Sequence, residues 1–207
     1  MNKFSARTVI ALAITVFIFS KCNVKKTGDE ETNTKDSVVA AAPYGGYKTQ
    51  VKFGEHLVSI AGCHDCHTPK KMGPSGPEMD FSLALSGHPA QMPAPDIDRK
   101  EVESKGLAVT NDLTAWVGPW GISYAANITS DSTGIGTGSE EQFLVCIREG
   151  KWMGLKNERT MLPPMPWREM GNMTDEELKA IFAYLKTTTP VHNVVPMVQP
   201  PLSAPNH

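Results

Sequence analysis

The short segment Cys63-His64-Asp65-Cys66-His67 restricts the fold of this chain more than any other part of its sequence. Two cysteines separated by two residues and followed directly by a histidine form the pattern to which a c-type haem is attached. This spacing lets both thiols form thioether bonds to one porphyrin, and it carries the adjacent histidine to the iron. The sequence therefore predicts one covalent haem c, with iron as its metal, attached at Cys63 and Cys66 and ligated by His67.

The rest of the chain does not favour a competing use of this motif. A four-ligand zinc site needs a second pair of ligands, and a thioredoxin-like dithiol needs a βαβ context. The sequence offers neither of them. Of the 4 cysteines, Cys22 lies near the N-terminus and Cys146 stands alone. Cys146 shares an i, i+3, i+4 stripe with Phe143 and Ile147, which predicts a buried and unreactive thiol.

A second iron ligand is predicted at Met165, because this methionine has a proline on either side. Pro164 and Pro166 fix backbone angles and remove amide donors, so the loop is stiff. A stiff loop suits the weak bond between a thioether and iron, and His/Met ligation is typical of electron-transfer haems. The alternatives are Met161 as the ligand, a bis-histidine haem that uses His88 or His192, an open sixth position, and a purely packing role for Met165.

The N-terminal residues indicate export from the cytoplasm. Lys3 and Arg7 precede an uncharged, mostly apolar run over residues 8–20, which is shorter than the about 20 residues that a membrane-spanning helix needs. Cys22 follows this run, so residues 1–22 resemble a bacterial lipoprotein signal whose cysteine becomes the lipidated N-terminus. The alternatives are an uncleaved anchor and simple secretion. All three place the domain outside the cytoplasm, and lipidation anchors it to a membrane on the periplasmic side.

Both ends of the exported chain are predicted to lack regular structure. Residues 23–43 are charged and rich in small residues, which is typical of a flexible tether. Residues 191–207 form a proline-rich C-terminal tail that either wraps around the domain or hangs free. The whole chain has a formal net charge of -2, so nucleic acid is not an expected partner.

Three helices are predicted within the central domain, residues 44–190. The first covers residues 51–62, has its apolar side chains on one face and delivers Cys63 at its end. The other two, over 139–149 and 174–187, each begin with a capping box. Helices of this length are marginal alone. We therefore expect them to bury a common surface together with the haem, and the first and third helices to cross each other.

This combination of features resembles the class I c-type cytochromes. A helix leads into the C-x-x-C-H motif with Pro69 shortly after it, a methionine lies between prolines, and a capped C-terminal helix ends in Tyr184-Leu185. Four stretches are also similar to the haem modules of bacterial membrane dehydrogenase cytochrome subunits. They are Asn127-Ile-Thr129, Thr133-Gly-Ile-Gly136, LPPMPW over 162–167 and MTDEELKAIFAYLKT over 173–187. The similarity covers about residues 47–196.

The resemblance implies a mainly α, class I cytochrome c fold around one covalent haem. Cys63 and Cys66 are then the thioether sites, His67 is the proximal ligand and Met165 the distal ligand. Pro69 is implied to lie against the proximal side of the haem. A single C-x-x-C-H motif also means that no electron passes between haems within the chain.

The connection between the motif and Met165 is longer than in compact cytochromes, which predicts a loop-rich insertion over about 70–131. Trp116, Trp120 and Tyr124 in this segment either shield one edge of the haem or pack as ordinary loop residues. Asn127 and Thr129 are candidates for hydrogen bonds to a haem propionate.

The predicted function is that of an exported, membrane-tethered electron carrier. No convincing acid–base pair or nucleophile triad points to an enzyme. The expected partners are an electron donor and an electron acceptor, namely an upstream dehydrogenase and a terminal oxidase or reductase. The alternatives are a haem subunit dedicated to one dehydrogenase complex, and a haem sensor or enzyme whose sixth ligand is labile.

Overall fold

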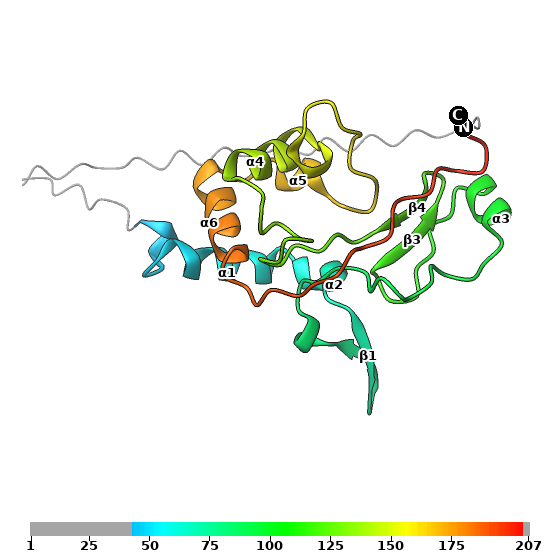
Figure 1. The fold of residues 1–207 in the computed structure, drawn as a ribbon, viewed down its shortest axis with the longest axis horizontal. Helices are drawn as coiled ribbons and strands as arrows, with labels where there is room; N and C mark the ends of the chain where they lie inside the picture. Colours follow the sequence, from blue (N-terminus) through cyan, green and yellow to red (C-terminus); the bar gives the residue numbers. More distant parts are fainter. Residues whose placement is uncertain (1–42, 205–207) are drawn as a thin grey trace, which may run out of the picture. The chain divides into compact units, whose positions relative to one another are not determined.

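The computed structural model describes residues 43–204, so the predicted leader, its Cys22 and nearly all of the tether lie outside the described residues. Helices are interspersed with two pairs of strands along this part of the chain (Figure 1). The α-helices are α1 (Gln50–Ile60), α2 (Cys63–His67), α3 (Arg99–Ser104), α4 (Glu140–Glu149), α5 (Trp167–Met170) and α6 (Asp175–Leu185). The strands are β1 (Lys70–Gly73), β2 (Gly76–Met79), β3 (Ala115–Gly118) and β4 (Gly121–Tyr124). Short 3-10 turns cover Tyr44–Gly46, Phe81–Leu83 and Trp152–Gly154.

The helices α1, α4 and α6 confirm the three helices predicted from the sequence. Both predicted capping boxes are formed. The Ser139 side chain accepts a hydrogen bond from the Gln142 backbone amide at the start of α4, and Thr174 accepts one from Glu177 at the start of α6. Each box satisfies amides that would otherwise lack a partner in the first turn, and so the local sequence fixes where these two helices begin.

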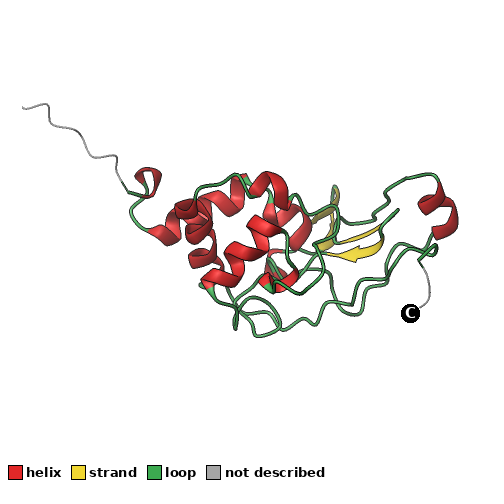
Figure 2. Ribbon diagram, turned by 90° about the horizontal axis from the view of Figure 1, so that it is seen from above, coloured by secondary structure: helices red, strands yellow, loops and turns green. Residues whose placement is uncertain are grey.

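The main apolar core lies where α1 packs across α6, as predicted. Figure 2 shows the longer helices gathered together on one side of the strands. The approach of the two helices is close at Gly54, where an added Cβ would lie 1.8 Å from the Ala180 carbonyl oxygen. The buried side chains of this core are Leu57, Val58, Leu85, Ile147, Leu178, Ala180, Ile181 and Leu185.

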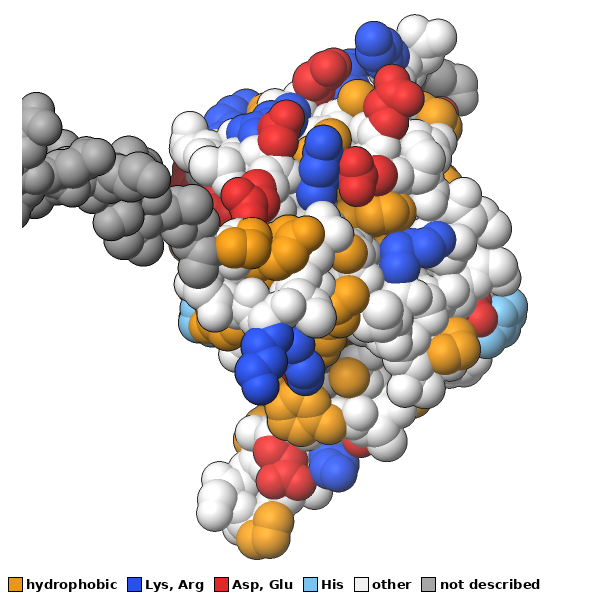
Figure 3. Space-filling model, turned by 90° about the vertical axis from the view of Figure 1, so that its left-hand side faces the viewer, with side chains coloured by type: hydrophobic (Ala, Val, Ile, Leu, Met, Phe, Trp, Pro, Cys, Tyr) orange, Lys and Arg blue, Asp and Glu red, His pale blue; other side chains and the backbone are white. Residues whose placement is uncertain are grey.

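Ion pairs on the surface contribute much less to stability than this core. In the face seen in Figure 3, acidic and basic side chains are interspersed among apolar ones. The Lys52–Glu55 pair has an N···O distance of 2.6 Å, and both side chains are about half exposed. A solvent-exposed pair of this kind contributes little to stability, because water and salt screen its charges, so the helices are held mainly by the apolar surface that they share.

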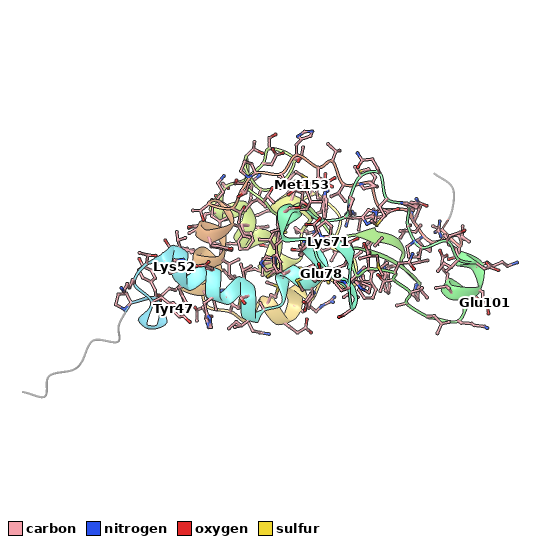
Figure 4. All side chains as sticks on the ribbon, turned by 90° about the horizontal axis from the view of Figure 1, so that it is seen from below. Tyr47, Lys52, Lys71, Glu78, Glu101 and Met153 are labelled. Carbon is pink, nitrogen blue, oxygen red and sulfur yellow. The ribbon has the colours of Figure 1, made fainter. Side chains whose placement is uncertain are left out.

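The prediction of a mainly α fold is only partly right, because two antiparallel hairpins join the helices. In the first, Lys71 of β1 is paired with Glu78 of β2, and Figure 4 shows these two residues close together. In the second, β3 pairs with β4 through a two-residue turn between Gly118 and Gly121. The fold is therefore a mixture of helices and short strands.

Both hairpins and α3 belong to residues 70–131, the segment predicted as a loop-rich insertion. Three of its buried apolar residues form a second, smaller cluster, namely Val102 in α3, Val117 in β3 and Ile122 in β4, whereas its Leu85 belongs to the main core. The segment thus has a small core of its own. Its status as an insertion relative to compact cytochromes stays a prediction.

The described part of the C-terminal tail lies along the domain rather than hanging free. Figure 1 shows it in red, running from the end of α6 towards β4 and α3. The Gln199 backbone exchanges two hydrogen bonds with Ile122, at 2.9 and 3.0 Å, and the Arg99 side chain donates to the Pro200 carbonyl at 2.8 Å. Within residues 43–204, every helix is too short or too polar to cross a membrane.

Candidate functional site

The C-x-x-C-H motif forms the short helix α2, which follows α1 after a sharp turn. Gly62 makes this turn in the left-handed conformation, with φ of 67°, which glycine adopts at little cost. Within α2, Cys63, Cys66 and His67 stand at positions i, i+3 and i+4, so all three lie on one face of the helix. The turn at Gly62 therefore presents both thiols and the histidine together at the end of α1.

The two thiols of the motif are suited to covalent attachment rather than to dithiol redox chemistry. Cys63 and Cys66 are both free and partly buried. Burial raises the pKa of the Cys63 thiol to about 11, and burial also raises the pKa of Cys66. A redox-active dithiol needs a lowered thiol pKa, so these thiols do not resemble a thioredoxin-type site.

His67 is held as a neutral imidazole with its proton on Nδ1. This nitrogen lies 2.7 Å from the backbone carbonyl oxygen of Ala126, and since a carbonyl can only accept, Nδ1 is the donor. Burial lowers the pKa of His67, which favours the uncharged ring. Nε2 therefore keeps its lone pair, and this is the state in which a histidine ligates a metal.

A backbone ladder between residues 85–88 and 125–128 holds the Ala126 carbonyl in place. Two hydrogen bonds of 2.9 Å join these segments, and the Gly87 amide donates to the His67 carbonyl at 2.8 Å. Gly87 has φ of 78°, and a Cβ at this position would lie 2.5 Å from the Ala125 carbonyl oxygen. Only glycine fits this position, so it is essential to the placement of His67.

Met165 packs against the same apolar cluster as Cys63. Its nearest competitor, Met161, is already engaged, because its sulfur lies 3.6 Å from the Cys146 thiol and accepts a hydrogen bond from it. Burial raises the pKa of Cys146, which agrees with the unreactive thiol expected there. These contacts favour Met165 over Met161 as the candidate for the second iron ligand.

The two histidines considered as alternative ligands have other roles in the structure. His88 is completely buried, and both of its ring nitrogens form hydrogen bonds with the protein. His192 has a side chain that is 72% exposed, with Nδ1 3.4 Å from Asp131. These contacts give His88 a hydrogen-bonding role in a loop and place His192 on the surface.

Asn127 and Thr129 hold their own loop through hydrogen bonds to protein groups. The Asn127 amide donates to Thr133 and to the Val191 carbonyl, at 3.0 and 2.8 Å. The Thr129 hydroxyl donates to Asn127 Oδ1 at 2.8 Å. All donor hydrogens of the two side chains are thus engaged, so a contact with a propionate stays a prediction that requires one of these bonds to be replaced.

The hairpin β3–β4 is joined to the methionine loop by Ser123. Its hydroxyl donates to the Pro163 carbonyl at 2.6 Å and accepts from the Trp120 indole nitrogen at 3.0 Å. Tyr124 instead packs against His88, with the ring centroids 4.9 Å apart and the ring planes tilted by 42°. Trp120 therefore supports the loop that carries Met165.

We expect Ser123→Ala to destabilise the protein by about 1–3 kcal/mol, because it leaves the Pro163 carbonyl and the Trp120 indole without their partner. Ser123 is only 6% exposed, so water does not readily replace the hydroxyl. Urea titration measures the free energy of unfolding. Ser104→Ala is the matched control, since its hydroxyl bonds a carbonyl in an exposed position. Equal losses in the two variants would show that Ser123 does not anchor the loop.

Sequence reasoning missed the residues that orient the ligands rather than the candidate ligands themselves. The Ala126 carbonyl is part of the backbone and has no side-chain signature. Gly87 lies before a His-Pro pair, which indicates a turn. The sequence does not indicate which distant segment Gly87 approaches. Ser123 is one serine of many, and only the folded hairpin brings it to Pro163.

The arrangement as a whole fits a covalently attached haem. Two free thiols and a neutral histidine share one helix face, and a methionine packs against the same apolar cluster as one of these thiols. In the described part of the chain, no three His, Cys, Asp or Glu side chains cluster to hold a separate metal ion.

Comparison with known proteins supports the same kind of site, although no family model matches the chain. It is 38% identical over 82 residues to the gluconate 2-dehydrogenase cytochrome c subunit of Pantoea cypripedii, covering 39% of this chain and 17% of that protein. It is 27% identical over 173 residues to the fructose dehydrogenase cytochrome subunit of Gluconobacter japonicus, covering 82% of this chain and 28% of that protein. The alcohol dehydrogenase (quinone) cytochrome c subunit of Gluconobacter oxydans (strain 621H) is 27% identical over 148 residues, covering 71% of this chain and 22% of that protein.

The chain thus spans less than a third of the length of each of these relatives. All three are named as cytochrome subunits of dehydrogenases and not as catalytic subunits. This confirms the predicted resemblance of the chain to the cytochrome c modules of bacterial dehydrogenases.

Proposed function

We propose that this chain is a monohaem c-type cytochrome that passes single electrons between redox proteins. Cys63 and Cys66 attach the haem, and His67 and Met165 ligate its iron. The observation that carries this proposal is the state of His67, whose proton is fixed on Nδ1 by the Ala126 carbonyl. Its Nε2 lone pair therefore points to metal ligation, and the neighbouring thiols supply the attachment.

When bound, the haem iron supplies a reversible one-electron couple between its ferric and ferrous states. The residues of the chain provide the surroundings of that couple. The Ala126 carbonyl orients the His67 ring, the prolines stiffen the Met165 loop, and the apolar cluster between α1 and α6 limits access of water. Ligand type and burial are the means by which a protein sets the potential of such a centre.

The proposed electron donor is a dehydrogenase, and the acceptor is a terminal oxidase or reductase. The names of the relatives support a dehydrogenase partner and also a closer variant, in which this chain is the haem subunit of one dehydrogenase complex. Co-purification with a catalytic subunit from detergent-solubilised membranes distinguishes these two cases.

The proposed location is the periplasmic side of a membrane, with a lipid attached to Cys22. The evidence is the N-terminal sequence, in which Cys22 follows an apolar run. We expect Cys22→Ser to move the haem-loaded protein from the membrane fraction to the soluble periplasmic fraction. Cys146→Ser is the control and leaves the distribution unchanged. If the Cys22 variant stayed in the membrane fraction, an uncleaved anchor would replace the lipid.

The visible spectrum of the reduced, haem-loaded protein tests the proposal, when it is recorded before and after carbon monoxide is added. A six-coordinate c-type spectrum that does not change supports a sealed electron carrier. A clear change shows an open or easily displaced sixth ligand, and it favours a sensor or enzyme instead. A protein that acquires no covalent haem during export would contradict the assignment of Cys63 and Cys66.

A further inference from the structure

The side chain of Asn193, in the C-terminal tail, forms all of its hydrogen bonds with one short segment, residues 86–90. Its Nδ2 donates to the Ser86 carbonyl at 2.7 Å and to the His88 carbonyl at 2.9 Å. Its Oδ1 accepts a hydrogen bond from the Ala90 amide at 3.0 Å. Only this orientation of the side-chain amide places its donors on carbonyls and its acceptor on an N–H group. The side chain thus holds a stretch of backbone that lies 103 to 107 residues away in the sequence.

This segment in turn holds the main chain of the proposed proximal ligand. The Gly87 amide donates to the His67 carbonyl at 2.8 Å, and the His88 amide donates to the Ala125 carbonyl at 2.9 Å. The next carbonyl along the chain, that of Ala126, accepts the hydrogen bond from the His67 ring at 2.7 Å. The segment therefore contacts His67 directly, and it also contacts the stretch of backbone that orients the histidine ring.

The main chain of Asn193 is bonded to a different segment, the loop of residues 127–133. Its amide donates to the Thr133 hydroxyl at 3.0 Å, and its carbonyl accepts a hydrogen bond from Asn127 Nδ2 at 3.4 Å. This loop directly follows Ala126, whose carbonyl orients the histidine ring. One residue of the tail thus ties together the two segments that hold the proposed proximal ligand.

The start of the tail is itself fixed, so Asn193 is not carried on a loose end of the chain. Helix α6 ends at Leu185, and shortly after it the Ser130 amide donates to the Thr188 hydroxyl at 3.1 Å. The Ser130 hydroxyl also donates to the Thr188 carbonyl at 2.6 Å, and Pro190 restricts its own φ angle. Because the tail leaves the main core along a defined path, the hydrogen bonds of Asn193 require little further loss of chain entropy.

We propose that Asn193 is a positioning residue for the proximal ligand His67, and that it acts by tying residues 86–90 to residues 127–133. This inference rests on the proposed function, because its effect is on a haem iron that His67 ligates. The hydrogen bond from His67 Nδ1 to the Ala126 carbonyl makes the ring a more basic ligand, and a more basic ligand favours ferric over ferrous iron. Asn193 keeps this bond in place, so the loss of its contacts weakens the bond and raises the reduction potential.

NMR of the reduced, haem-loaded, full-length protein tests the proposal through the exchange of the His67 Nδ1 proton with water. Asn193→Asp is the decisive variant, because aspartate keeps the shape of the side chain but loses both donations to the carbonyls of Ser86 and His88. We expect the proton to exchange at least about tenfold faster than in the wild-type protein, because carboxylate oxygens then face these two carbonyl oxygens. We also expect the reduction potential, measured by potentiometric titration, to rise.

Arg99→Met is the matched control, because Arg99 holds the far end of the same tail. Its guanidinium donates to the Gln199 side chain at 3.2 Å and to the Pro200 carbonyl at 2.8 Å, and both contacts lie outside residues 86–90. We expect this variant to unfold at a lower urea concentration but to keep the exchange rate and the potential of the wild-type protein. Equal acceleration of exchange in the two variants would show that the tail only stabilises the whole domain, and it would overturn the specific role of Asn193.

An exchange rate that Asn193→Asp leaves unchanged overturns the proposal, whatever the potential does. If this variant does not fold, the wild-type protein decides the matter through the protection of two backbone amides. The Gly87 amide is bonded to His67 and the Ala90 amide to Asn193, so we expect equal protection of both, as parts of one unit that opens together. Much weaker protection at Ala90 would show that the tail releases the segment without freeing His67, and it would overturn the proposal. A wild-type protein without a covalent haem instead overturns the proposed function itself.

Discussion

Replacing Met165 with alanine will open the iron to carbon monoxide and lower the reduction potential of the haem-loaded protein. In the proposed site the Met165 thioether is the distal ligand, and a methionine in this position raises the potential. Axial ligands as a class set potentials over a range of about 0.8 V, so we expect a fall on the order of 100 mV. Potentiometric titration and the carbon monoxide difference spectrum measure the two effects.

Met161→Ala is the matched control, because it removes a thioether from the same loop. The Met161 sulfur is bonded to the Cys146 thiol, so we expect a small loss of stability and an unchanged spectrum. The reverse result, with an open iron in the Met161 variant only, would assign the distal ligand to Met161. An effect in neither variant would show that no methionine of this loop ligates the iron.

Local sequence signals were sufficient for the three longest helices, α1, α4 and α6, whereas α3 and α5 were not predicted. The capping boxes at Ser139 and Thr174 act within one turn, so they fix the start of α4 and α6 whatever the rest of the chain does. The crossing of α1 and α6 also followed from their apolar faces, since two such faces must be buried against something.

The hairpins could not be predicted from local signals. In β1 and β2, exposed and partly buried residues do not alternate, so the period of two that indicates a strand is absent. In β3 and β4 nearly all residues are buried, and such a run does not distinguish a strand from a buried loop. These strands also make contacts with residues distant in sequence, such as the bridge between Ile122 and Gln199.

The candidate site also has a part that the sequence predicts and a part that only the fold shows. The motif itself predicts Cys63, Cys66 and His67, because the chemistry of attachment requires their spacing. The orientation of His67 depends instead on a carbonyl 59 residues away in the sequence. A backbone carbonyl is present at every residue, so only the fold can show which one is used.

The second large effect concerns Gly54, where we expect alanine to destabilise the protein strongly. In most helices Gly→Ala is stabilising by roughly 0.5–1 kcal/mol, because alanine loses less conformational freedom. At Gly54 the added Cβ would lie 1.8 Å from the Ala180 carbonyl oxygen and 2.8 Å from the Tyr184 Cβ. Backbone atoms of α6 cannot move aside locally, so α1 and α6 must separate. We expect a loss of at least about 3 kcal/mol, at the upper end of over-packing.

Gly138→Ala is the control for this prediction. There the nearest atom to an added Cβ is the Ile135 carbonyl oxygen at 3.4 Å, an ordinary contact, so we expect no loss of stability. Urea unfolding of the haem-loaded proteins gives both values. Because α1 leads directly into α2, separation of α1 from α6 also displaces Cys63 from the apolar cluster. We therefore expect the Gly54 variant to acquire less covalent haem than the control, and equal stability and equal haem content would show that this close helix crossing does not position the motif.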